Sequence, residues 1–201
     1  GPEFKALFDA HIPNWRQQPQ ALAEAVNIPA EEVRAAKLKA KKRLISYINS
    51  ISGAGFTDEI LTICFARRAA AYKRATLIFT DLEYLFNLSY DRVQYVFAGK
   101  SHPQDSAGKQ LLKEIIDIGK QYEQKVRLVF VPNYNIWLGG LMTQGCDVWL
   151  NTPRRPREAS GTSGMKVCFN AGINMSVLDG WWREACHNRV NGWAIGDDED
   201  Q

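Results

Sequence analysis

Residues 158–166 place a carboxylate, hydroxyls, glycines and a lysine at the start of an apolar segment. Residues 164–171 are predicted to form a helix, and the small polar residues before it would leave backbone N–H groups available to an anion. Lys166 lies one turn inside this helix, and a partly desolvated lysine readily forms a Schiff base with an aldehyde. The segment therefore indicates a site for a phosphate and a sugar. The alternative is a Ser-Gly turn with a solvated lysine.

Three cations follow the first predicted strand: Arg67, Arg68 and Lys73. One guanidinium group can donate to two phosphate oxygens at once, and an ammonium adds a compact positive charge. Cations at the start of a helix are unfavourable unless an anion is present, because the helix macrodipole already places positive charge there. The cluster therefore indicates phosphate binding, with a solvated helix start as the alternative.

The elements that must position these residues alternate between short β-rich runs and helical runs. Strands are predicted at residues 60–65, 93–98, 127–131, 147–150 and 174–177, and helices at 69–79, 81–88, 107–121, 136–144 and 164–171. This alternation predicts an α/β fold, with a Rossmann-like parallel sheet flanked by helices on both faces. Ligands of such sheets bind at the carboxyl ends of the strands, where residues 67–73, 99–103, 133–134 and 152–166 would converge.

An N-terminal helical segment precedes the sheet. Residues 30–50 space apolar side chains along one side of a charged helix, and the glycines at 53 and 55 end it. We interpret residues 1–4 as the remnant of a cleaved tag and residues 5–52 as a helical lead-in segment. Residues 53–201 are predicted to form the Rossmann-like domain.

Composition narrows the classes of function. The formal net charge of +3 gives no global case for nucleic-acid binding, and no apolar stretch approaches the roughly 20 residues that span a membrane. The four cysteines lack Cys-x-x-Cys spacing and are expected to be reduced, buried thiols in a cytoplasmic protein. No histidine has a partner at metal-ligand spacing, so we expect no metal.

The segment Glu158-Ala-Ser-Gly-Thr-x-x-Met-Lys166 resembles the pyridoxal-phosphate segment of the glycogen and α-glucan phosphorylases. Other stretches resemble the same family in the same order, at residues 66–74, 97–103, 133–134, 152–156 and 178–180. The resemblance runs from about Trp15 to the end of the chain. It is closest to the short bacterial and archaeal branch, which is maltodextrin phosphorylase-like.

The resemblance implies roles for the matching residues. Lys166 would bind pyridoxal 5'-phosphate as a Schiff base, and Arg68 and Lys73 would hold the substrate phosphate, which makes these three the catalytic residues. The other matches divide between the coenzyme (Thr162, Ser163, Arg67 and Tyr134) and the transferred glucosyl unit (Glu158, Ser160 and Gly161). From the residue types alone, Glu158 could instead cap a helix and Tyr134 could fill the core. Many members of the family have lysine in place of Arg67, and others have arginine in place of Asn135.

The resemblance also implies the second domain of the GT-B two-domain glycosyltransferase architecture. The implied reaction is retaining: an α-1,4-glucan and inorganic phosphate give glucose 1-phosphate. The coenzyme phosphate would shuttle a proton, since a group with a second pKa of about 6 can do so at neutral pH. The family's amino-terminal domain and final helices are missing from this sequence, so we expect the fragment alone to be inactive.

Two other functions remain open. A nucleotide-sugar-dependent glycosyltransferase of the glycogen synthase type shares the architecture, although Lys166 in its Gly-Thr-x-x-Met-Lys context disfavours it. The second alternative is that the chain is a non-catalytic half that only binds glucans or a partner chain. Uncovered apolar surface on such a half would favour association, including a homo-oligomer.

Overall fold

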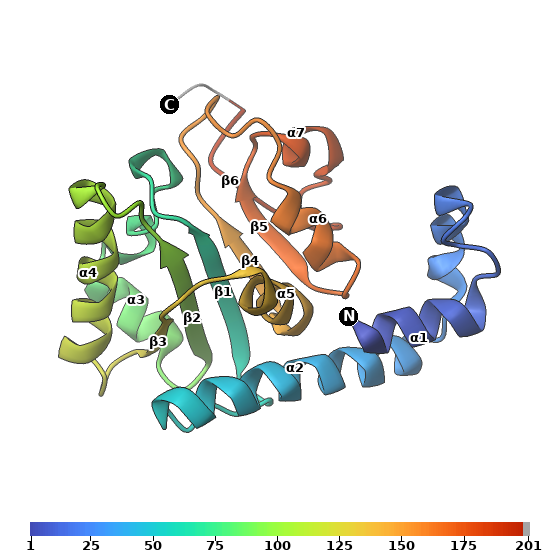
Figure 1. The fold of residues 1–201 in the computed structure, drawn as a ribbon, viewed down its shortest axis with the longest axis horizontal. Coiled ribbons are helices and arrows are strands. Elements are labelled where there is room, and N and C mark those ends of the chain that lie inside the picture. The colour runs from blue at the N-terminus through green and yellow to red at the C-terminus, as the bar shows by residue number, and fades with distance from the viewer. Residues whose placement is uncertain (199–201) are drawn as a thin grey trace.

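Six parallel strands form the centre of the protein, whose computed structural model describes residues 1–198 (Figure 1). The spatial order is β3-β2-β1-β4-β5-β6, and every neighbouring pair is parallel. The strands are β1 (Leu61–Arg68), β2 (Val93–Lys100), β3 (Arg127–Val131), β4 (Val148–Asn151), β5 (Ile173–Val177) and β6 (Gly192–Ile195). This confirms the predicted α/β fold with a Rossmann-like sheet.

Helices cover both faces of the sheet (Figure 1). They are α1 (Pro2–His11), α2 (Ala30–Ser52), α3 (Leu82–Ser89), α4 (Ser106–Gln121), α5 (Ile136–Gly145), α6 (Thr162–Cys168) and α7 (Trp181–Ala185). Successive side chains of a strand point to opposite faces. Phe65 therefore packs in one buried cluster with Ile115 of α4, whereas Ala66 packs in another with Leu44 of α2 and Leu138 of α5.

Most predicted elements are found with small shifts at their ends. The strand predicted at 127–131 is β3 without change, and the helix predicted at 164–171 is α6, which begins two residues earlier. Sequence reasoning did not predict α1, α7 and β6. The helix predicted at 69–79 is wrong, because this segment forms two 3₁₀ turns, Ala71–Lys73 and Leu77–Phe79.

Tertiary hydrogen bonds explain why residues 69–79 are not helical. Arg154 donates its backbone N–H to the Tyr72 carbonyl at 2.6 Å. The Thr152 hydroxyl lies 3.0 Å from the carbonyl oxygens of both Lys73 and Arg74. These carbonyls therefore bond to the loop after β4 instead of to a following helical turn. Arg74 ends the first turn with a left-handed φ of 47°.

Helix α2 is fixed to the sheet by two lysines. The mostly buried Lys37 ammonium donates to three backbone carbonyls, those of Gln144, Cys146 and Asn170. Burial lowers the pKa of Lys37, because it penalises the charged form. Lys41 donates to Asp147 Oδ2 at 2.5 Å and to the Ile60 carbonyl at 2.8 Å. Lys41 is buried and Lys37 half-buried, so these two charged residues of α2 face the sheet instead of solvent.

The first helix packs beside α2 (Figure 1). Its Phe4 side chain is buried in a cluster with Leu7 and Ile12. The division of the chain into residues 1–4, 5–52 and 53–201 stays a prediction, and residues 199–201 lie outside the described residues.

The cysteines divide by burial. Cys64 and Cys146 are buried, as predicted, but Cys168 is exposed and Cys186 only half-buried, because they lie at the end of α6 and just after α7. All four are free thiols. Within residues 1–198, none of the helices combines the length and apolar character needed to cross a membrane.

Candidate active site

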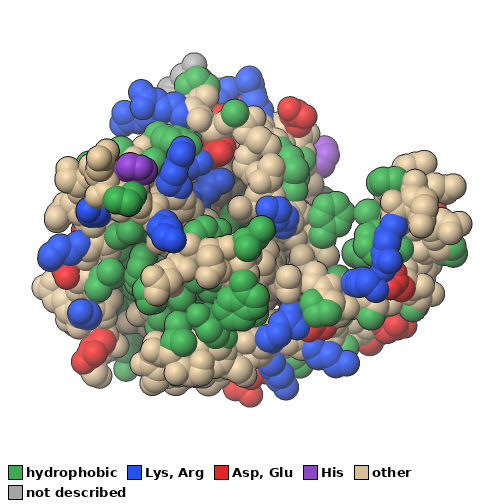
Figure 2. Space-filling view, viewed as in Figure 1, with side chains coloured by type: hydrophobic (Ala, Val, Ile, Leu, Met, Phe, Trp, Pro, Cys, Tyr) green, Lys and Arg blue, Asp and Glu red, His purple; other side chains and the backbone are tan. Residues whose placement is uncertain are grey.

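The loops singled out in the sequence follow four neighbouring strands at one edge of the sheet. Because β3, β2, β1 and β4 are adjacent and parallel, their carboxyl ends meet there (Figure 1). Arg67 near the end of β1 is level with Gly99 of β2. Lys and Arg side chains gather along the upper edge of the face in Figure 2, where the loops after β1 and β4 lie in Figure 1. The predicted convergence of the loops is confirmed.

A buried ionic cluster lies at this edge. Arg67 Nη1 donates to Glu158 Oε2 at 2.6 Å, and Lys73 Nζ donates to the same oxygen. The side chains of Arg67, Lys73 and Glu158 are only 7%, 10% and 10% exposed. Arg67 Nη1 also donates to Asn151 Oδ1. Two cations thus share one carboxylate in a place with little water, which leaves the cluster with an excess of positive charge.

Lys73 reaches the cluster because its backbone is bent into a 3₁₀ turn. The Arg74 guanidinium donates to the Thr152 and Pro153 carbonyls at 3.0 and 2.9 Å, which joins this turn to the loop after β4. The Lys73 ammonium also lies 4.6 Å from the centre of the Tyr72 ring, within the range of a cation–π contact. The loop after β1 is therefore held against the segment that carries Glu158.

Asp179 holds the backbone of Glu158. Its Oδ2 accepts the Glu158 N–H at 2.8 Å, and its Oδ1 accepts the Gly180 N–H at 2.9 Å. The Trp181 N–H donates to the Ser160 carbonyl at 2.9 Å. The segment after β5 thus clamps the turn that precedes α6.

Two glycines shape this turn. Gly161 has a left-handed φ of 86°, and a Cβ at Gly180, whose φ is 56°, would lie 2.4 Å from the Ser160 carbonyl oxygen. Residues with a Cβ atom rarely adopt such backbone conformations, and position 180 also has no room for a methyl group. The glycines of the motif are therefore required by the geometry of the loop around Ser160.

Other predicted site residues lie on the same loops but outside the ionic cluster. Thr162 and Lys166 are exposed on α6, Ser163 is half-buried, and Arg68 is exposed at the end of β1. Within residues 1–198, no hydrogen bond joins the side chain of Lys166 or Arg68 to the cluster. Their proposed roles toward a coenzyme or a substrate stay predictions.

Tyr134 follows β3 at the carboxyl ends of the strands and is half-buried. Burial raises the pKa of its phenol, and the nearby charge of Arg67 opposes this by stabilising the phenolate. A Cβ at Gly139 would lie 2.9 Å from the Tyr134 hydroxyl oxygen, so the phenol packs against the first turn of α5. The structure brings Tyr134 near Arg67, as expected for two residues of one site.

Sequence reasoning missed two contributors to the site. Asn151 is the last residue of β4 and orients Arg67, while its Nδ2 donates to Ser176 Oγ at 2.9 Å. Asp179 belonged to the Leu-Asp-Gly motif but received no role. A polar residue at the carboxyl end of a buried strand was the available signal for Asn151.

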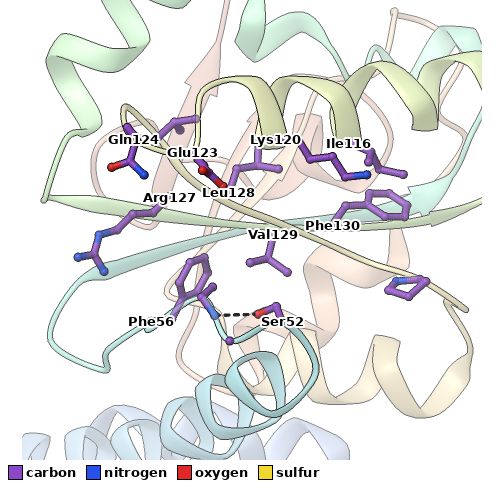
Figure 3. A pocket seen from close by; sticks show the side chains of 15 residues that line it. Ser52, Phe56, Ile116, Lys120, Glu123, Gln124, Arg127, Leu128, Val129 and Phe130 are labelled. Atoms are coloured by element: carbon purple, nitrogen blue, oxygen red, sulfur yellow. Dashed lines mark hydrogen bonds between the residues drawn. The ribbon is translucent and has the colours of Figure 1, made fainter.

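A groove of about 700 Å³ lies elsewhere, at the edge strand β3 (Figure 3). It is lined by residues of β3, of the carboxyl half of α4 and of the loop after α2, where the Ala54 N–H donates to Ser52 Oγ at 3.3 Å. Phe56, Val129 and Phe130 make much of it apolar. None of its lining residues belongs to the ionic cluster, so this groove and the candidate active site are separate features.

The donor set of the carboxyl edge fits a phosphorylated coenzyme. Arg67 and Lys73 bring more positive charge than Glu158 neutralises, and α6 carries an amine at Lys166 and a hydroxyl at Ser163. These groups could hold a phosphate and an aldehyde.

A parallel sheet with an excess of buried cations at its carboxyl edge defines an α/β protein suited to binding anions. Comparison with known proteins narrows this class. The family model for carbohydrate phosphorylases matches residues 2–188. The chain belongs to the carbohydrate phosphorylase family.

Named relatives are similar over most of this chain. The maltodextrin phosphorylase of Thermococcus litoralis is 43% identical over 98% of the chain and 26% of its own length. The glycogen phosphorylase of Aquifex aeolicus is 41% identical over 86% of the chain and 28% of its own length, and that of Mycobacterium tuberculosis is 45% identical over 70% and 16%. The chain thus spans about a quarter or less of these relatives.

Proposed function

We propose that this chain is part of an α-glucan phosphorylase that cleaves α-1,4-glucans with inorganic phosphate and releases glucose 1-phosphate with retention. The observation that carries the proposal is the buried cluster of Arg67, Lys73 and Glu158, which joins anion-binding groups to a carboxylate able to bind sugar hydroxyls. The relatives named as maltodextrin and glycogen phosphorylases support it.

In the proposed mechanism, Arg68 and Lys73 bind the substrate phosphate and stabilise charge that develops on it. Arg67, Thr162, Ser163 and Tyr134 would hold pyridoxal 5'-phosphate, with Lys166 as its covalent attachment point. When bound, the coenzyme would supply a phosphate group able to exchange a proton near neutral pH. Glu158, with Ser160 and Gly161, accepts hydrogen bonds from the transferred glucosyl unit and orients it.

The proposed active site is incomplete in this chain alone. The relatives are several times longer, and we assign the missing wall to an amino-terminal domain of the same protein. Ile136 and Trp137 begin α5 next to the site and are 95% and 57% exposed, and hydrophobic side chains gather in the middle of the face in Figure 2. Without the opposing wall, the exposed Arg68, Thr162 and Lys166 face water, so we expect no phosphorolysis from the 201 residues alone.

Two further assignments belong to the proposal. The four free thiols are consistent with a reducing compartment, and we place the protein in the cytoplasm. The exposed apolar residues at the start of α5 would also favour association between copies of the isolated chain.

The test is phosphorolysis by the full-length parent protein. Glucose 1-phosphate should form from an α-1,4-glucan only when phosphate is present. Lys166→Ala should remove bound coenzyme and activity together, whereas Lys113→Ala, at an exposed position of α4, should change neither. Release of free glucose without phosphate would indicate a hydrolase. A requirement for a nucleotide sugar would indicate a glycosyltransferase, and retained coenzyme in Lys166→Ala would refute the role of this lysine.

A further inference from the structure

We propose that Glu158 is an internal counter-ion, which occupies the anion site of Arg67 and Lys73 and must be displaced when a phosphate group binds there, whether that of the coenzyme at Arg67 or that of the substrate at Lys73. The choice of phosphate as the anion rests on the proposed function. The competition itself follows from the geometry of the cluster.

One carboxylate oxygen accepts hydrogen bonds from both cations. Glu158 Oε2 accepts from Arg67 Nη1 and from Lys73 Nζ, so it stands where an oxygen of a bound oxyanion would have to stand. All three side chains are about nine-tenths buried. An oxyanion that takes the N–H donors now used by Glu158 Oε2 must displace the carboxylate from them, so phosphate bound in this way competes with Glu158.

The charges explain why the cluster is closed without a ligand and why phosphate can open it. Two buried cations with no anion between them would repel each other and lack solvation, and Glu158 relieves part of this cost. A carboxylate neutralises only one of them. Phosphate carries up to two negative charges and has more acceptor oxygens, so it neutralises both cations and accepts from both directly.

The backbone permits the carboxylate to leave. Asp179 holds the Glu158 N–H at 2.8 Å, while the neighbouring Ala159 and Ser160 are exposed. The Glu158 side chain can therefore rotate away without unfolding the turn. Once released, its carboxylate becomes available to sugar hydroxyls, so that phosphate and glucan binding assist each other.

The experiment is calorimetric titration of the 201-residue chain with inorganic phosphate at constant ionic strength. Glu158→Gln keeps the shape of the side chain and removes its charge. We expect it to bind phosphate at least about tenfold more tightly than the wild type, because a charge-assisted contact no longer competes. Glu114→Gln removes the same charge from an exposed position of α4 and should leave the affinity unchanged. Equal affinity in Glu158→Gln and wild type, or binding by neither, would overturn the proposal.

If the Glu158→Gln variant does not fold, the proposal can still be tested by a measurement on the wild type. Sulfate is an oxyanion that does not react with carbodiimide, so carboxyl labelling can be followed by mass spectrometry while sulfate is added. Labelling of Glu158 should rise several-fold as sulfate saturates the site, whereas labelling that stays low would overturn the proposal. Neither experiment needs coenzyme or glucan. A parent protein without phosphorolysis would refute the proposed function and leave the competition between Glu158 and oxyanions standing.

Discussion

Replacing Asp179 by alanine should destabilise the protein and loosen the turn that carries Glu158. The Asp179 carboxylate is 6% exposed and accepts the N–H groups of Glu158 and Gly180 at 2.8 and 2.9 Å. A hydrogen bond to a charged group contributes about 1.5–3 kcal/mol, and a buried donor left without a partner adds a desolvation cost. Since Gly180 is only half-buried, we expect a total loss of about 2–4 kcal/mol.

Urea unfolding followed by tryptophan fluorescence measures this loss. Asp179→Asn retains one acceptor oxygen and should lose about half as much free energy of unfolding. Asp117→Ala removes a carboxylate that is 51% exposed in a surface pair with Lys113, and should cost less than about 0.5 kcal/mol. The reasoning is refuted if Asp179→Ala costs no more than Asp117→Ala.

Three other predictions follow from the same geometry. Gly180→Ala should cost at least about 2 kcal/mol in urea unfolding, because its Cβ would lie 2.4 Å from the Ser160 carbonyl oxygen. Gly53→Ala, with a similar φ and open space around it, should cost only about 1 kcal/mol, and equal costs would contradict the clash. Because burial raises the pKa of Tyr134, the unfolded chain ionises first as pH rises above about 10. The free energy of unfolding of the wild type should therefore fall above about pH 10 more than that of Tyr134→Phe. If the two proteins show parallel pH profiles, the pKa of Tyr134 is not raised by folding. In the full-length parent, Arg68→Ala should raise the activation free energy derived from kcat/KM for phosphate by about 2–4 kcal/mol, with normal coenzyme content. Unchanged phosphate kinetics would leave Arg68 as surface charge.

Five of the six strands could be predicted, because their apolar runs are short and alternate with helical patterns. The strand predicted at residues 127–131 has the same bounds as β3. In residues 69–79, tertiary contacts override local helix propensity. Three consecutive alanines favour a helix locally, but hydrogen bonds from Thr152 and Arg154 take the backbone carbonyls that a helix would use. A partner some 80 residues away in the sequence decided the structure of this segment.

The edge of the sheet that carries the site could be predicted, but not the contacts within it. Parallel strands bring their carboxyl ends together whatever the loops contain, so the grouping of the cationic loop with residues 152–166 followed from topology. The shared oxygen of Glu158 joins Arg67 and Lys73 across 91 and 85 residues. That contact depends on the path of two irregular loops, which carries no periodic signal. The sequence therefore suggested three separate ligand contacts where the structure has one ionic cluster.

The anchoring of α2 has a consequence for how the chain is made. Lys37 bonds to carbonyls that lie 107, 109 and 133 residues later in the sequence. During synthesis, α2 leaves the ribosome long before α5 and the end of α6 exist. Its apolar side, with Leu44, Ile45 and Ile48, has no cover in that interval. The apolar side of α2 therefore stays without this cover until more than 100 further residues have been made, and exposed apolar surface of this kind favours aggregation during synthesis.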